Sequence, residues 1–197
     1  MIQRHTVSHA ARIALVTITV VAVAACAQPP EEEMAAARQA VERAEANSDV
    51  SRYAPETIQE ARQLLSDMEA AAENEEYESA LSLADDARNT ADQAVQDAEA
   101  AKAAARDRAQ QAVATAGEAL EEALTALNDA RDVSGIDLDF QATAGELAAA
   151  DDAVTAAESH LNGEQYPEAE NTAEEARSLI SDTMRHISNA VRAASSK

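Results

Sequence analysis

The longest regular pattern in the sequence runs from Glu75 to Ala130 and reads EEYESALSLADDARNTADQAVQDAEAAKAAARDRAQQAVATAGEALEEALTALNDA. Its small and apolar residues recur at alternating intervals of three and four positions, which places them on one face of a helix. No proline interrupts the stretch, and Gly117 is its only glycine. The pattern therefore predicts one continuous helix, about 80 Å long. The stripe consists of Tyr77, Ala80, Ala84, Ala87, Ala91, Ala94, Ala98, Ala101, Ala105, Ala109, Ala112, Ala116, Ala119 and Ala123.

The stripe slips once, by an extra step of four residues between Ala105 and Ala109. Such a step is a stutter, which locally relaxes a supercoil. The chain has no Trp, one Phe and three Tyr, so its core must be built from alanine and aliphatic side chains. Alanine lets helices approach closely but buries little area, so we expect stability to come from helix length and from the helix propensity of alanine.

The sequence also repeats itself with a shift of 89 positions. The shift aligns Tyr77 with Tyr166 and makes two turns coincide, Glu73–Glu76 and Asn162–Gly163. Each copy has a helical stripe before its turn and another after it, which predicts a helical hairpin. The stripes before the turns are Ile58, Ala61, Leu65, Met68 and Ala72 in the first copy and Leu147, Ala150, Val154, Ala157 and Leu161 in the second.

We therefore predict an all-α fold, an elongated alanine-rich bundle of two related three-helix units that share one long central helix. The first unit is expected to span residues 31–108, and the second 109–197. Residues 48–52 are polar and predict a break between helices. Thr143-Ala144-Gly145-Glu146 matches a capping box and predicts a helix start.

The first 25 residues have the composition of a secretory signal peptide. Arg4 and Arg12 are followed by an apolar stretch from Ile13 to Ala25, which is shorter than the roughly 20 residues of a membrane-spanning helix. Its end, Val23-Ala24-Ala25-Cys26, resembles the bacterial lipobox, in which the cysteine receives a diacylglyceryl group. Cys26 is the only cysteine in the chain. Lipidation explains it better than a lone buried thiol or an uncleaved membrane helix does.

The lipobox resemblance implies an anchor of several acyl chains, which holds a protein firmly at a membrane. Ala27 rather than Asp follows the cysteine. By the sorting rule of Gram-negative lipoproteins, this residue implies an outer-membrane location facing the periplasm. Residues 26–30 would then be the lipidated cysteine and a short tether, because Pro29 and Pro30 cannot continue a helix.

The chain is strongly acidic, with a formal net charge of −22. Removal of the signal segment would make it more negative, since that segment carries two arginines and no acid. Such a charge repels nucleic acid, and we expect no nucleic-acid partner. The alanine stripes can pair within one chain or between chains, so the oligomeric state stays open.

Acidic pairs recur on the predicted helices, mostly away from the apolar stripe. Calcium needs a folded loop of oxygen ligands, typically with a sharp glycine turn, and the sequence has no such loop, so we favour a solvated face. His160 and His186 lack the spacing of zinc or di-iron helices, and we favour surface positions for both. Without a phosphate-binding or nucleophile motif, we expect no catalytic residue, metal or cofactor, and no enzyme. The acidic pairs are Asp85-Asp86, Glu121-Glu122, Asp151-Asp152 and Glu174-Glu175.

Tyr77 and Tyr166 each occupy a stripe position beside a turn. An amphipathic ring there suits either a partner-binding corner or the packing of the hairpin corner, and we favour packing. The sequence closes with Ala194-Ser195-Ser196-Lys197. It weakly resembles the murein lipoprotein of enteric bacteria, a single short alanine-rich helix whose terminal lysine is joined to peptidoglycan. This resemblance makes Lys197 a candidate for peptidoglycan linkage.

A closer resemblance covers about Met34 to Ala105. It rests on three segments, Arg52-Tyr53-Ala54-Pro55-Glu56, Glu75-Glu76-Tyr77-Glu78-Ser79-Ala80 and Ala84-Asp85-Asp86-Ala87. Together they resemble a helical domain of unknown function that occurs in many proteobacterial lipoproteins, sometimes beside an OmpA-like peptidoglycan-binding domain. The second unit keeps the Tyr-x-x-Ala turn but has Ala142-Thr143-Ala144-Gly145 in place of Tyr-Ala-Pro-Glu. The family brings no known active site.

The leading functional hypothesis is a non-enzymatic structural or protein-interaction lipoprotein of the outer membrane. Its lipid would bind the membrane, and its partner would be an envelope protein or peptidoglycan. One alternative is a periplasmic module that binds cations or other ligands through its acidic faces. Another is a peptidoglycan tether through Lys197.

Overall fold

The computed structural model describes residues 28–196, and this part of the chain is helical, with no strand. The predicted all-α fold is confirmed. The signal segment 1–25, Cys26 and Lys197 lie outside the described residues. The helices are α1 (Glu31–Ala46), α2 (Ser48–Tyr53), α3 (Pro55–Glu73), α4 (Tyr77–Ala130), α5 (Phe140–Asn162) and α6 (Tyr166–Ser195).

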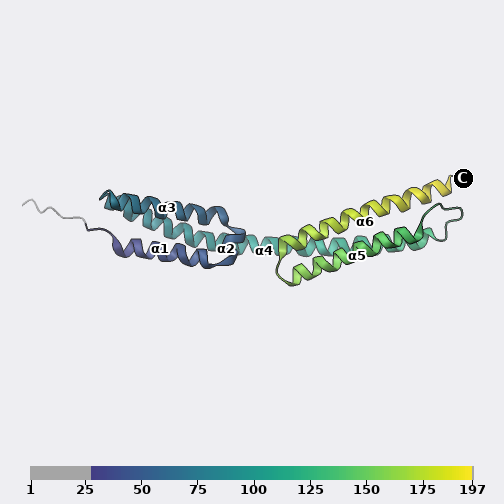
Figure 1. Ribbon diagram of the computed structural model, residues 1–197, viewed down its shortest axis with the longest axis horizontal. Helices are drawn as coiled ribbons and strands as arrows, with labels where there is room; N and C mark the ends of the chain where they lie inside the picture. Colours follow the sequence, from purple (N-terminus) through teal and green to yellow (C-terminus); the bar gives the residue numbers. More distant parts are fainter. Residues whose placement is uncertain (1–27, 197) are drawn as a thin grey trace, which may run out of the picture.

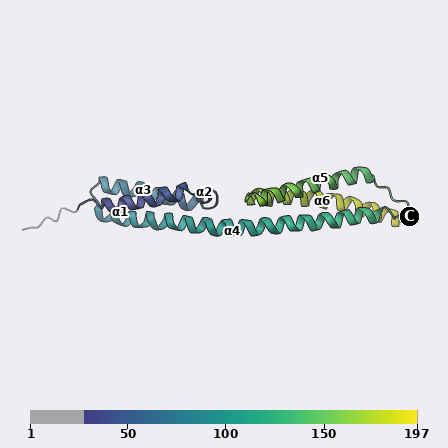
Figure 2. The ribbon, with the colours of Figure 1, turned by 90° about the horizontal axis from the view of Figure 1, so that it is seen from below.

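Helix α4 is continuous for 54 residues and runs the length of an elongated bundle. Figures 1 and 2 show α1, α2 and α3 along its first half and α5 and α6 along its second half. At the usual rise per residue α4 is about 80 Å long, as the sequence predicts. It passes the expected boundary between residues 108 and 109 without a break.

The predicted stripe forms the buried face of α4, with one correction. The alanines from Ala80 to Ala98 in the stripe are buried as expected. Ala116 and Ala123 are fully buried as predicted, but Val113 and Leu120 take the buried positions between and beside them, whereas the predicted Ala101, Ala112 and Ala119 are only partly buried. The successive steps of four from Ala105 through Ala109 to Val113 rotate the buried face, which is the effect of a stutter.

Two hairpin turns of the same geometry connect α3 to α4 and α5 to α6. In the first, Glu76 N–H donates to Ala71 O at 2.8 Å and Glu75 N–H to Ala72 O at 3.1 Å. The second repeats these bonds 89 positions later, and the left-handed residues are Glu75 and Glu164, with φ of 62° and 57°. This pair of bonds is the Schellman arrangement, which closes a helix and satisfies its last carbonyls.

Two helix starts differ from the sequence predictions. The expected break at residues 48–52 is instead the short helix α2, because the Asn47 side chain accepts from Asp49 N–H at 2.9 Å and Val50 is fully buried. The capping box at Thr143 is also wrong, since α5 begins at Phe140. Asp139 caps this helix by accepting from Gln141 and Ala142 N–H, both at 3.0 Å.

The bundle has separate apolar clusters at its two ends and a small one between them. We call α1, α2, α3 and α4 up to Ala98 the first unit, and α4 from Val113 with α5 and α6 the second unit. The segment of α4 between them, residues 99–112, is the junction segment. No helix within residues 28–196 is long and apolar enough to cross a membrane.

Candidate functional site at the junction of the two units

The junction segment carries a small apolar cluster that joins the two units. Ala105 and Ala109 of α4 pack with Tyr166 and Ala169 at the start of α6, and Tyr166 is only 8% exposed. Tyr53, the last residue of α2, packs both against this cluster and against the core of the first unit. The Tyr53 ring is therefore a direct apolar link between the units.

The hydroxyl of Tyr53 is buried and has no hydrogen-bond partner in the described part of the chain. A buried hydroxyl without a partner loses its hydration and gains nothing in return. The ring of Tyr53, in contrast, packs against apolar residues of both units. The ring is thus the part of Tyr53 that holds the junction together.

Lys102 connects the two units through charge. Its Nζ donates to Asp49 Oδ2 in α2 at 3.1 Å and lies 3.0 Å from Glu164 Oε2 in the α5–α6 turn. The bond to Glu164 and then the bond to Asp49 raise the pKa of Lys102 above its ordinary value. Lys102 therefore keeps its charge throughout the physiological range, and the bridge persists with it.

Two further ion pairs lie at the same junction. Arg52 of α2 is 3.9 Å from Glu168, and Arg108 of the junction segment donates to Glu170 at 3.3 Å. Three glutamates in the α5–α6 turn and the first turn of α6 thus face three cations from α2 and the junction segment. These pairs reach solvent and are screened by salt, so they act chiefly on the relative orientation of the units.

The structure separates the two tyrosines that the sequence singled out. Tyr166 lies in the junction cluster, in agreement with packing of a hairpin corner, and Tyr77 is only partly buried at the far end of the first unit. Sequence reasoning missed Lys102 and Tyr53. Lys102 is the only lysine among residues 28–196 and lies beside the stripe residue Ala101, which was the one available signal.

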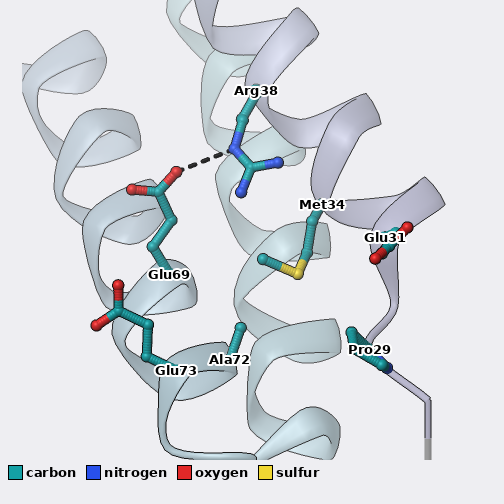
Figure 3. A pocket seen from close by; sticks show the side chains of 7 residues that line it. All are labelled: Pro29, Glu31, Met34, Arg38, Glu69, Ala72 and Glu73. Carbon is teal, nitrogen blue, oxygen red and sulfur yellow. Dashed lines mark hydrogen bonds and ion pairs between the residues drawn. The ribbon is translucent and has the colours of Figure 1, made fainter.

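A shallow depression opens at the end of the first unit where α1 begins. Figure 3 shows the Met34 side chain between α1 and α3, with Arg38 and Glu69 above it. Arg38 Nε donates to Glu69 Oε1 at 2.9 Å, so this cation and carboxylate already satisfy one another. Pro29, Glu31, Ala72 and Glu73 complete its walls. The glutamates come from two helices and do not converge on one point (Figure 3).

The acidic pairs and histidines lie at the surface or close to it. All eight carboxylates of the four acidic pairs are exposed. His186 is exposed, and His160 is partly exposed, with Nδ1 2.9 Å from Gln165 Oε1. Within residues 28–196, no three His, Cys, Asp or Glu side chains are grouped so as to hold a metal ion.

The fold and the junction define a class of protein, an extended helical bundle in which two units share one long helix and meet through ion pairs. Residues 32–116 match the model of a domain of unknown function, DUF4398. The match covers the first unit and the junction segment and ends at Ala116 in the second unit. It confirms the resemblance to a helical domain of unknown function, while the lipoprotein setting stays a prediction. Neither the curated proteins nor the solved structures include a significant match to the chain.

Proposed function

We propose that the protein is a non-enzymatic structural and protein-interaction module, anchored by lipid on Cys26 to the outer membrane and extending into the periplasm. The observation that carries this proposal is the continuous helix α4, which holds two units in line over about 80 Å. A long, thin bundle with exposed charges offers partners a surface along its whole length, from the anchored end outward.

The charge of the molecule supports an interaction role. The chain carries a formal charge of −22, and the acidic pairs lie in solvent on both units. A surface of one sign attracts basic partners and speeds their association, and it keeps the bundle off anionic head groups. Partner choice would therefore depend on charge complementarity.

The anchor is tested by Cys26→Ser in the full chain. We expect this variant to keep its helical content by circular dichroism and to move from the membrane fraction to the soluble periplasmic fraction. Ala27→Asp, in contrast, should leave the protein in membranes but shift it from the outer to the inner membrane. Membrane association that survived Cys26→Ser would contradict the lipid anchor.

The interaction role is tested by crosslinking intact envelopes and purifying the wild-type protein, with the Cys26→Ser variant as the matched control. We expect a defined envelope protein to be recovered with the anchored form and depleted with the released form. Recovery of no specific protein from either form would overturn the interaction role.

A further inference from the structure

The repeat produces two corners that have the same turn geometry but different surroundings. We call residues 73–79, the α3–α4 turn and the start of α4, the proximal corner, because it lies at the end where α1 begins (Figure 1). Residues 162–170, the α5–α6 turn and the start of α6, form the junction corner. Tyr77 and Tyr166 hold the same position in the two corners.

The junction corner is covered. Tyr53, Ala105 and Ala109 enclose the ring of Tyr166. Lys102, Arg52 and Arg108 pair with its three glutamates. Within the chain itself, an aromatic ring therefore packs on the tyrosine of this corner, and cations pair with its carboxylates.

The proximal corner lacks this cover among the described residues. Its four glutamates are exposed, and none of them forms an ion pair within residues 28–196. Tyr77 is only partly buried, and the residues that would correspond to Ala105 and Ala109 fall at positions 16 and 20, outside the described part. The four glutamates are Glu73, Glu75, Glu76 and Glu78.

We propose that the proximal corner binds a basic helix end of another envelope protein, which lays an aromatic ring on Tyr77 and directs Lys or Arg toward the glutamates. This proposal rests on the proposed interaction role and specifies its surface and the chemistry of the partner. The corner lies at the end of the bundle that carries the tether, so the partner would be at the membrane surface.

A second copy of this chain fits the corner less well. The residues at the junction corner come from α2 and the junction segment and include Asp49, Arg52, Tyr53 and Lys102. The residues 89 positions later, at the far end of the second unit, are Leu138, Gln141, Ala142 and Val191. These four positions carry neither the ring nor the cation; Phe140 and Arg192 are their sequence neighbours, and the ring of Phe140 is already covered by Arg131, 5.9 Å from its centroid. Two copies of a chain with a net charge of −22 also repel one another, which favours a different, basic protein over head-to-tail assembly.

The test is site-specific photocrosslinking in living cells with Tyr77→p-benzoylphenylalanine, which keeps an aromatic ring at the corner. The same substitution at Ala149, exposed on α5, is the control position. We expect position 77, but not position 149, to crosslink to one envelope protein, through a segment that contains Lys or Arg and an aromatic residue. Mass spectrometry of the crosslinked peptide identifies that segment.

A charge test accompanies the crosslink. Glu75→Gln with Glu78→Gln should reduce the yield from position 77 at least fivefold, whereas Glu121→Gln with Glu122→Gln, a matched pair elsewhere on α4, should not. A crosslink from position 77 to a second copy, to residues 1–27 of the same chain or to no protein would overturn the proposal. If envelope crosslinking of the whole protein still recovered a partner, the interaction role would stand while the assigned surface failed.

Discussion

Glu75 and Glu164 occupy equivalent positions in two turns 89 residues apart, and both have a left-handed backbone, with φ of 62° and 57°. Their side chains have different surroundings. Glu164 lies 3.0 Å from Lys102, whereas Glu75 forms no ion pair within the described residues. A residue with a Cβ is strained in this conformation. Glu164 is strained but forms an ion pair with Lys102, whereas Glu75 is strained and forms no ion pair within the described residues.

Glu75→Gly should therefore stabilise the protein. Left-handed backbone costs a residue with a Cβ about 1–2 kcal/mol, and the added freedom of glycine in the unfolded chain takes back about half of this. We expect the free energy of unfolding, measured by urea denaturation, to rise by about 0.5 kcal/mol. Glu75→Ala is the control and should give no gain, because it keeps the Cβ. A loss of stability in Glu75→Gly would show that the strain is not the dominant effect.

Lys102→Gln should loosen the coupling between the two units without unfolding either. The variant keeps a polar side chain but removes the charge that holds Asp49 and Glu164. With spin labels introduced by Ser66→Cys on α3 and Ser178→Cys on α6, in a Cys26→Ser background, pulsed electron resonance should show a broader distance distribution. Arg106→Gln is the matched control, since Arg106 pairs only with its neighbour Asp107. Equal distributions in both variants would mean that α4 alone sets the orientation.

The bridge at Lys102 should respond to alkaline rather than to neutral pH. Hydrogen bonds to Glu164 and Asp49 raise the pKa of Lys102 in the folded protein. A raised lysine pKa gives stability that is complete below the ordinary value, about 10.4, and is lost as the pH rises through the folded value. The difference in melting temperature between wild type and Lys102→Gln should be constant from pH 7 to about pH 9.5 and shrink above about pH 10.4. A difference that vanished between pH 6 and 8 would contradict this assignment.

The buried alanine stripe of α4 should not tolerate larger side chains. Ala94 is fully buried on α4 against the core of the first unit, where close helix approach leaves no space for a longer side chain. Ala94→Leu should lower the free energy of unfolding by about 1–3 kcal/mol, measured by chemical denaturation. Ala104→Leu, exposed on the same helix, should change it little. Equal changes in the free energy of unfolding for the two substitutions would indicate that the stripe is loosely packed.

Much of the fold could be predicted because its signals are local. The three-four spacing of the stripe decides that residues 77–130 are helical, and the paired turns reveal the repeat. Local patterns were less reliable at helix starts. Asn47 and Asp139 cap α2 and α5, and neither is followed three residues later by the Glu or Gln of a capping box.

The candidate site could not be predicted because its residues are distant in sequence. Lys102 and Asp49 are 53 positions apart, and no spacing rule connects them. The repeated stripe and turn singled out Tyr166, but they gave no indication that Tyr53 would pack beside it. Such pairings depend on how two helical units are placed on a third helix, which is a property of the whole bundle.

The sequence by itself determined the helical class, the unbroken α4, the duplication and the acidic surface, because periodicity, helix propensity and charge are properties of neighbouring residues. Tertiary structure alone decided that the buried face of α4 shifts to Val113 and Leu120, and that one corner of the repeat is covered while the other is open. The physical reason is that burial depends on which surface lies opposite. Tyr77 and Tyr166 share the Tyr-x-x-Ala spacing and the geometry of the preceding turn, yet one is partly exposed and the other buried because different surfaces lie opposite them.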